Sequence, residues 1–432
     1  MLRRNFLKYT SAVAAMALIP VESMAATYTG PLWVFVQASG GWDPTSFCDP
    51  KGFKLDENGD MESNPMNRSY AATAIATSTS ATDIKYAPVT GDGYSFSTFF
   101  DKYGKDLLIV NGVDTQTNGH DAGRRYIMSG RLAEGYPAIS ALIAGISNPT
   151  SPLAFVTSGG YDKTNGVVAG TRLSNTQVIE ELAFVNLQDT DTNYKSTKTM
   201  TLLEKAQASR IKRQIDKQNL EGIKKEMSQY ENAHSGSNEL KKLINNIKDP
   251  LIDPDTGNGF NNSVYKQGRL AMAGYKAGLT SSVNISQGGF DTHSQHDTNQ
   301  LRSLGRLLEG VDLLKQEAVR QGIEQKVIFV MISDFGRTPG YNQNNGKDHW
   351  SVSSVMFMGP GINGGRVVGS SSARHNAEKV NAKTLKRDIN GIKITYAHVN
   401  KAMRKLAGIE NNKLATQYYP LDGTIEDLNL FT

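Results

Sequence analysis

The stretch from Val327 to Trp350 constrains the fold of this chain more than any other. It opens with a short, continuous apolar run, VIFVMI, which is rich in β-branched residues and bounded by polar ones. A run of this kind predicts a strand buried on both faces, as in a parallel sheet covered by helices. The run stops at Ser333 and Asp334. This predicts a carboxylate at the carboxyl edge of the sheet, where open α/β folds bind ligands.

Two further strand-like runs end in a shared pattern. Both Leu32–Val36 and Val283–Ser286 lead into Gly-Gly-aromatic-Asp, at residues 40–43 and 288–291. A predicted helix over Thr298–Arg320 separates the second run from the strand that begins at Val327, and such a crossover is long enough for the two strands to run parallel. We therefore expect the aspartates after these strands to emerge at one edge of an α/β sheet.

Histidines and further carboxylates follow the same predicted strand ends. The seven positions from Asp291 to Asp297 contain two imidazoles and two carboxylates, and Asp348 and His349 follow about fourteen residues after Asp334. Taken singly, such an aspartate can cap a turn and such a histidine can be an ordinary loop residue. Because they recur at separate strand ends that meet at one edge, we expect them to bind a divalent transition metal or a metal pair.

The rest of the chain fits the same class. Asp106–Asn111 predicts another buried strand, followed by a polar elbow and a helix over Ala122–Met128, whose N-terminus favours an anion. A long amphipathic helix over Thr201–Tyr230 and a second charged helix over Asn238–Ile247 predict a helical insertion near residues 200–248 that lies over the sheet. The low-complexity stretch Ala71–Asp83 predicts a surface excursion.

Residues 1–25 predict an export signal rather than part of the fold. They have a basic head, a short apolar middle and a small-residue cleavage site, and Arg3-Arg4 with Phe6-Leu7-Lys8 resembles the twin-arginine signal. The apolar part is shorter than the ~20 residues that a membrane span needs. We therefore expect one α/β domain over residues 26–432, exported folded by the twin-arginine machinery to the periplasm or beyond, with no stable membrane span.

Charge and cysteine content exclude two other classes. The full chain has a net charge of +5, and residues 1–25 hold three basic groups and one acidic group, so the mature chain keeps +3. This charge is too small to indicate nucleic-acid binding, and no arginine-rich run supports it. Cys48 is the only cysteine, so no intrachain disulfide can form.

Four motifs together resemble the exported bacterial family described as domain of unknown function 1501. They are Gly40-Gly41-Trp42-Asp43, Gly289-Phe290-Asp291-Thr292-His293, Ser333-Asp334-Phe335-Gly336-Arg337-Thr338-Pro339 and Asp348-His349-Trp350. That family resembles the alkaline phosphatase and sulfatase superfamily. The resemblance implies a three-layer α/β/α sandwich with a largely parallel central sheet and a two-metal hydrolytic centre.

The resemblance also implies metal-binding roles for individual residues. Asp43 and Asp334 would hold one metal, and Asp291, with His349 and either His293 or His296, would hold the other. Phe335 stands where the superfamily has a metal-binding histidine. Either His120 or Asp348 fills that position from elsewhere, or the second metal is weak or absent. The metal would be Zn or one of Ca, Mg and Mn, with one or two ions per chain.

Catalytic roles follow from the same resemblance. The superfamily places its nucleophile at the elbow after the second strand, where this chain has Thr115 and Thr117. Arg124, Arg125 and Arg337 are candidates to clamp an anionic ester, because a guanidinium matches phosphate or sulfate oxygens. The predicted activity is hydrolysis of phosphate or sulfate esters, with an anionic ester or glycan as partner. The alternative is an inactive hydrolase fold that serves as a metal-containing binding or assembly module, and metal content distinguishes the two.

Overall fold

The computed structural model describes residues 28–172, 193–220, 222–224, 227–228, 237–247 and 249–431. The predicted export signal lies outside these residues. Within them, no helix combines the length and the apolar character needed to cross a bilayer.

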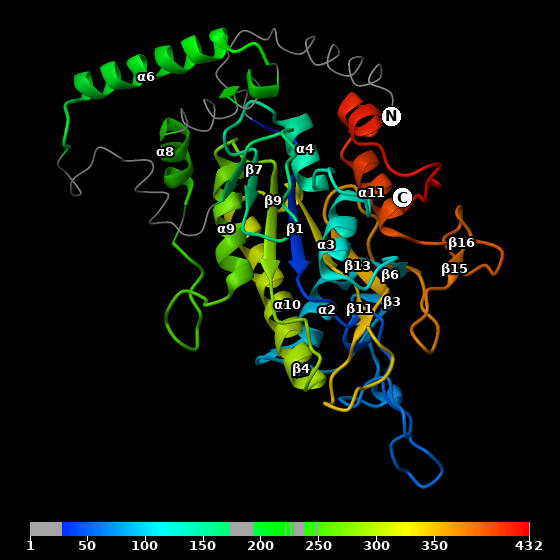
Figure 1. Ribbon diagram of the computed structural model, residues 1–432. Coiled ribbons are helices and arrows are strands. Elements are labelled where there is room, and N and C mark those ends of the chain that lie inside the picture. The colour runs from blue at the N-terminus through cyan, green and yellow to red at the C-terminus, as the bar shows by residue number, and fades with distance from the viewer. Residues whose placement is uncertain are drawn as a thin grey trace.

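An eight-stranded sheet forms the centre of the molecule (Figure 1). All neighbouring strands pair in parallel except at β13, which is antiparallel to both of its neighbours. In spatial order the strands are β14 (Arg366–Gly369), β6 (Leu108–Asp114), β13 (Val352–Met358), β10 (Val327–Ser333), β1 (Leu32–Ala38), β9 (Ser282–Gln287), β7 (Phe155–Thr157) and β8 (Gly170–Arg172).

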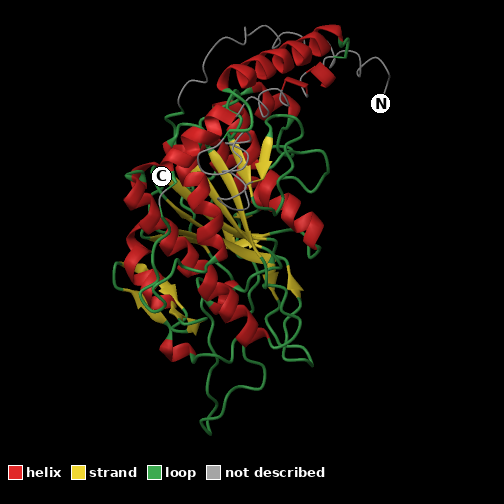
Figure 2. Ribbon diagram, turned by 90° about the vertical axis from the view of Figure 1, so that its left-hand side faces the viewer, coloured by secondary structure: helices red, strands yellow, loops and turns green. Residues whose placement is uncertain are grey.

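Helices cover both faces of this sheet (Figure 2). Leu32, Val34 and Val36 of β1 pack into one hydrophobic core, whereas Trp33 and Phe35 pack into a second core on the opposite face. This alternation follows from the two-residue period of a strand. The first face is covered by α2 (Phe96–Tyr103), α8 (Ser237–Asn246), α9 (Ser263–Lys276) and α10 (His296–Gln321), and the second by α3 (His120–Ser129), α4 (Ile139–Ser147) and α11 (Tyr396–Leu406). The predicted three-layer α/β/α sandwich with a largely parallel sheet is confirmed.

The register of the central strands places the predicted site at one edge. Ala38 at the end of β1 lies opposite Ser333 of β10 on one side and Gln287 of β9 on the other. The segments that follow these three strands therefore leave the sheet together, as the crossover argument predicted. A short antiparallel pair continues the site beyond the sheet, because β11 (Gly336–Arg337) pairs with β12 (His349–Trp350).

The predicted helical insertion differs from the structure in two respects. The helix predicted over Thr201–Tyr230 is interrupted: α6 (Thr197–Lys217) ends where Gln218 turns to extended backbone, and residues 222–224 and 227–228 are helical again. Two apolar residues of this helix are also exposed, because Leu202 and Leu203 expose 60% and 53% of their surface. Of the two helices α6 and α8, α8 packs on the core through Leu243, while α6 lies apart from the sheet (Figure 1). Both helices have a charged amphipathic sequence, so this pattern alone does not predict which of them packs against the core.

Helix α9 runs unbroken through Gly268 and Gly274, although glycine disfavours helix interiors. A Cβ at Gly268 would lie 2.6 Å from a Leu314 side-chain carbon, so this glycine allows α9 to approach α10 closely. The stretch Ala71–Asp83, predicted as a surface excursion, has only one buried residue, Ser78, and it contains β2 (Ala76–Ser78) and the start of β3 (Ala81–Tyr86), which form an antiparallel pair.

Candidate metal centre

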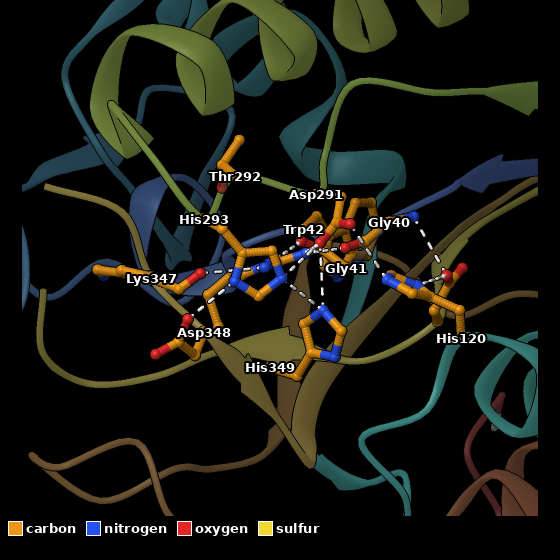
Figure 3. A network of polar contacts seen from close by, with 12 residues as sticks. Gly40, Gly41, Trp42, His120, Asp291, Thr292, His293, Lys347, Asp348 and His349 are labelled. Atoms are coloured by element: carbon orange, nitrogen blue, oxygen red, sulfur yellow. Dashed lines mark hydrogen bonds and ion pairs between the residues drawn. The ribbon is translucent and has the colours of Figure 1, made fainter. Parts of the chain in front are cut away.

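Three histidines from separate elements converge on the carboxylate of Asp291 (Figure 3). His120 begins α3 after the β6 elbow, His293 lies two residues after Asp291 in the loop that follows β9, and His349 lies in β12. Their Nε2 atoms lie 3.3, 3.1 and 3.2 Å from the Asp291 oxygens, and the Nε2 atoms of His293 and His349 are 2.9 Å apart. One ligand atom each from His120, Asp291 and His349 lie within 4.8 Å of one another.

In each ring, the partner of the outer nitrogen, Nδ1, determines whether the inner nitrogen, Nε2, carries a proton or a lone pair. Nδ1 of His120 lies 2.9 Å from Asp334 Oδ2, Nδ1 of His293 lies 2.8 Å from Asp348 Oδ1, and Nδ1 of His349 lies 2.7 Å from the carbonyl oxygen of Asn118. Carboxylate and carbonyl oxygens only accept, so each Nδ1 carries the proton and donates it. In the neutral ring, each Nε2 therefore directs a lone pair toward Asp291.

Such convergence is unfavourable without a positive charge between the lone pairs. Two neutral imidazoles with their Nε2 atoms 2.9 Å apart cannot hydrogen-bond, because both Nε2 atoms are acceptors. A shared proton or a cation resolves the conflict. Metal-binding histidines typically donate their other N–H to a carboxylate or a carbonyl, as all three do here. Three imidazole nitrogens and one carboxylate oxygen form a donor set that suits Zn²⁺.

The charges around the centre shift the pKa values of His120 and Asp291. The hydrogen bond to Asp334 raises the pKa of His120 above its usual value, against the opposing effect of burial. Burial alone would raise the pKa of Asp291, but the hydrogen bond and charge of Arg337 and the contact with His349 lower it to about 2. Asp291 is therefore a carboxylate at neutral pH and is ready to accept a cation.

Phe335 forms one wall of the centre. Its fully buried ring lies 4.9 Å from the His120 ring and 4.4 Å from the His349 ring, measured between centroids. The two glycines of the first motif make room for this arrangement. A Cβ at Gly40 would lie 2.5 Å from the Asp291 backbone nitrogen, one at Gly41 would lie 2.6 Å from the Phe335 ring, and both residues have positive φ. The Gly-Gly pattern thus reflects close packing beneath the centre.

Asp43 lies in a separate, closed pocket. Its Oδ2 contacts Nζ of Lys347 at 2.6 Å and Nε2 of His296 at 3.1 Å, and its Oδ1 accepts from the backbone N–H and the hydroxyl of Thr45. The side chains of Asp43, His296 and Lys347 are all fully buried. Burial alone would raise the pKa of Asp43, but the Lys347 ammonium and the His296 hydrogen bond hold it well below its usual value.

Asp334 and Asp348, also predicted as metal ligands, lie behind the histidines. Asp334 Oδ2 accepts from His120 Nδ1 and from the Gly40 backbone N–H, while Asp348 Oδ1 accepts from His293 Nδ1. Asp334 Oδ1 is buried and has no hydrogen-bond partner among the described residues. Both carboxylates therefore orient imidazole rings.

The two predicted threonine nucleophiles differ in accessibility. Thr115 is fully buried, and its hydroxyl lies 2.9 Å from the carbonyl oxygen of Thr117 and 3.0 Å from that of Ser351. Thr117 is only partly buried, and its hydroxyl oxygen accepts from the Gly119 backbone N–H at 3.2 Å. It lies one residue before Asn118, whose carbonyl orients His349.

The candidate arginines also occupy different positions. Arg337 is fully buried, donates to the carbonyl oxygens of Gly40, Gly41 and Lys347, and contacts Asp291 Oδ1 at 2.7 Å. This contact therefore orients the Asp291 carboxylate. Arg124 and Arg125 lie on α3, where they form ion pairs with Asp121 at 2.8 Å and Glu134 at 2.9 Å.

Comparison with known proteins assigns the chain to a family. A family model described as "Protein of unknown function (DUF1501)" matches residues 32–399. The chain belongs to the DUF1501 family. No curated protein sequence matches it.

The solved structures that match this DUF1501 protein are distant from it. The lipoteichoic acid synthase of Listeria monocytogenes is 10% identical, with a TM-score of 0.40, over 98% of this chain and 81% of that one. A sulfatase from Pseudoalteromonas sp. is 10% identical, with a TM-score of 0.40, over 98% and 76%. A protein of the alkaline phosphatase superfamily from Vibrio parahaemolyticus is 8% identical, with a TM-score of 0.36, over 95% and 76%.

A hollow of about 500 Å³ opens beside the centre of the DUF1501 protein. It is lined mainly by polar groups from the β9 end and from α10, including Gln287, Asp291, Asn299, Arg302 and Arg306. The Arg306 guanidinium is held by Asp92 at 2.5 Å. Arg302 is exposed and makes no ion pair among the described residues. The hollow therefore offers positive charge next to the carboxylate on which the histidines converge.

Two groups that build these sites were not predicted. Lys347 lies between Gly346 and Asp348 in a polar loop, and nothing in such a sequence indicates a buried ammonium. Asn118 contributes only its backbone carbonyl, which leaves no signature in residue type. Proximity to the Asp-His-Trp motif was the one available signal for Lys347.

Proposed function

We propose that this protein is an exported, metal-dependent hydrolase of phosphate or sulfate esters, with His120, Asp291, His293 and His349 as the metal ligands. The observation that carries the proposal is the orientation of the three imidazoles, which donate outward through Nδ1 and direct Nε2 toward one carboxylate. Among the metals considered, Zn²⁺ fits these nitrogen donors best.

A bound divalent cation would supply Lewis acidity toward an ester oxygen. The protein itself keeps the ligands rigid. Asp334, Asp348 and the Asn118 carbonyl orient the three rings, and Arg337 holds Asp291. The Phe335 ring excludes water from one side of His120 and His349. This preorganisation limits rearrangement during the reaction.

The adjacent hollow supports an anionic ester or glycan as the substrate. Arg302 lies there without an ion-pair partner among the described residues, and Arg306 is tethered to Asp92. A guanidinium fits sulfate and phosphate oxygens through paired N–H donors. Of the two predicted nucleophiles, we keep Thr117, because the Thr115 hydroxyl is buried and directed at backbone carbonyls.

The proposal is tested by turnover of an aryl phosphate and an aryl sulfate by mature, metal-loaded protein. We expect turnover of at least one ester, its loss in Asp291→Asn, and a raised KM in Arg302→Gln. Asp312→Asn is a control outside the centre, because Asp312 pairs with Lys102 between α10 and α2. Metal-loaded protein that turns over neither ester contradicts the proposal.

A second candidate function is a metal-containing binding or assembly module without turnover. It is favoured by the buried Thr115 hydroxyl and by Phe335 at a position that the superfamily pattern gives to a ligand. In that case, metal-loaded protein binds an anionic glycan and leaves both aryl esters intact.

Export by the twin-arginine route remains part of both proposals, and replacing Arg3 and Arg4 by lysine should retain the chain in the cytoplasm.

A further inference from the structure

We infer that the Lys347 ammonium takes the place of a second metal ion at Asp43, so that the chain has one exchangeable metal position. This inference rests on the proposed metal centre at Asp291 and deepens it. The superfamily resemblance implied two ions, with Asp43 as a ligand of one of them. The residues around Asp43 do not fit that second ion.

The Asp43 carboxylate has no oxygen left for a metal. Oδ1 accepts from the Thr45 backbone N–H at 3.0 Å and from its hydroxyl at 2.6 Å. Oδ2 accepts from Lys347 Nζ at 2.6 Å and lies 3.1 Å from His296 Nε2. A carboxylate offers about four lone-pair directions, and four donors occupy them here. The negative charge is thus neutralised inside the protein.

The imidazole of His296 is oriented opposite to those of the open centre. The Thr292 hydroxyl lies 2.7 Å from His296 Nδ1. If this hydroxyl donates to Nδ1, the proton of the neutral ring is on Nε2 and is donated to Asp43. The Thr292 hydroxyl and the Asp43 carboxylate then each have a hydrogen-bond partner on the His296 ring. His296 then presents an N–H, and not a lone pair, to the position that a metal would need.

Several contacts hold the ammonium in this pocket. Lys347 Nζ lies 5.1 Å from the centroid of the Tyr341 ring, a favourable position for a cation. The Lys347 backbone is fixed as well: its N–H donates to the Thr292 carbonyl, and its carbonyl accepts from Arg337 Nη1, each at 3.0 Å. Arg337 also contacts Asp291, so the same guanidinium links the closed pocket to the open centre.

One acceptor from the implied second site remains unpaired. Asp334 Oδ1 is buried without a partner among the described residues. A single carboxylate oxygen is far below the four ligands of a zinc site or the six or more of a calcium site. With Asp43 neutralised by Lys347, this oxygen alone cannot hold a second divalent ion.

The experiment counts metal per chain by elemental analysis after chelation, reloading with Zn²⁺ or Mn²⁺ and desalting. We compare the mature wild type with Asp291→Asn, Lys347→Ala and the double variant Asp43→Asn/Lys347→Ala. Lys347→Ala leaves both space and an uncompensated carboxylate, whereas the double variant is the matched control without that charge. The expected counts are one for the wild type, none for Asp291→Asn, two for Lys347→Ala and one for the double variant.

Two equivalents in the wild type, or one in folded Lys347→Ala, overturn the Lys347 assignment while leaving the Asp291 centre intact. No metal in the wild type overturns both. If Lys347→Ala does not fold alone, its near-UV circular dichroism should recover with divalent cation, and the double variant should fold without it. Failure of that rescue also overturns the assignment. Ester turnover is not part of these counts, so inactivity toward aryl esters would contradict the proposed hydrolysis alone.

Discussion

Two neighbouring aspartate–histidine sites in this molecule have opposite electrostatic character. At Asp43, one imidazole and one ammonium surround a fully buried carboxylate, and every acceptor is matched by a donor inside the protein. At Asp291, three imidazoles face a carboxylate whose side chain is 48% exposed, and their inner nitrogens have no proton of their own to give. The difference lies in the partner of the outer ring nitrogen.

This comparison shows why residue type alone does not identify a metal ligand. An acceptor behind Nδ1 makes the inner nitrogen a ligand, whereas a hydroxyl donor behind it makes the inner nitrogen an N–H donor. Asp334, Asp348 and Asn118 supply acceptors at the open centre, and Thr292 supplies the hydroxyl at the closed pocket. The first arrangement leaves lone pairs that a shared proton or an external cation can satisfy, whereas the second already contains a cation, the Lys347 ammonium.

The largest expected effect concerns the closed pocket. Lys347→Met removes the ammonium but leaves the Asp43 charge buried, and breaking a buried pair in this way costs about 3–5 kcal/mol. Urea denaturation should therefore show a loss of this size in the free energy of unfolding. Asp43→Asn/Lys347→Met removes both charges and should recover most of the loss. A single variant as stable as the wild type would show that the two charges are not coupled.

The next effect concerns the open centre. Asp291→Asn removes the negative charge on which three imidazoles converge. We therefore expect metal affinity to fall by more than about 100-fold, which exceeds the loss expected when a residue that only hydrogen-bonds to a metal ligand is replaced. Titration calorimetry measures this change. The matched variant Asp43→Asn/Lys347→Met should retain affinity within about threefold, since its site is already neutral. Equal losses in both variants would remove the distinction between the two sites.

A smaller effect is expected from the groups behind the rings. Asp348→Asn weakens the acceptor of His293 Nδ1, which should reduce metal affinity by about 10- to 100-fold. Asp348→Ala should lose at least as much affinity, because it removes the acceptor entirely. An unchanged affinity in both variants would show that His293 is not a ligand and that the centre consists of His120, Asp291 and His349.

The smallest effect is acid sensitivity of the closed pocket. The folded pKa of Asp43 is depressed, so its stabilising contribution is present above the unfolded value of about 3.9 and is lost as pH falls toward the folded pKa. Below about pH 4, this one group should add a slope of about 1.4 kcal/mol per pH unit to the free energy of unfolding. Asp43→Asn/Lys347→Met should lack that component, and parallel pH profiles would contradict it.

Much of the fold followed from local sequence patterns. The apolar runs that end at Val36, Ser286 and Ile332 are strands, and the long crossover between the second and the third allowed their shared direction to be predicted. Pattern arguments failed where docking depends on distant partners. The apolar residues Leu202 and Leu203 of α6 are exposed, and the antiparallel direction of β13 has no signature in its own residues.

The sequence predicted where the candidate site lies but not which of its side chains contact one another. Strand ends indicated where Asp43, Asp291 and Asp334 would emerge. His120 and Asp348 were the two residues considered for the ligand position that Phe335 occupies, beside the alternative of a weak or absent second metal. Burial of Lys347 depends on the Tyr341 ring and the Thr292 carbonyl, which are distant features of the folded chain. Proton positions on the rings likewise depend on partners that only the three-dimensional structure brings together.

Anomalous diffraction from a crystal of mature protein loaded with Zn²⁺ tests the central claim most directly. We predict one strong peak within coordination distance of Asp291 and of the Nε2 atoms of His120, His293 and His349, with Lys347 Nζ still on Asp43. A peak beside Asp43, or no peak at Asp291, would contradict the account.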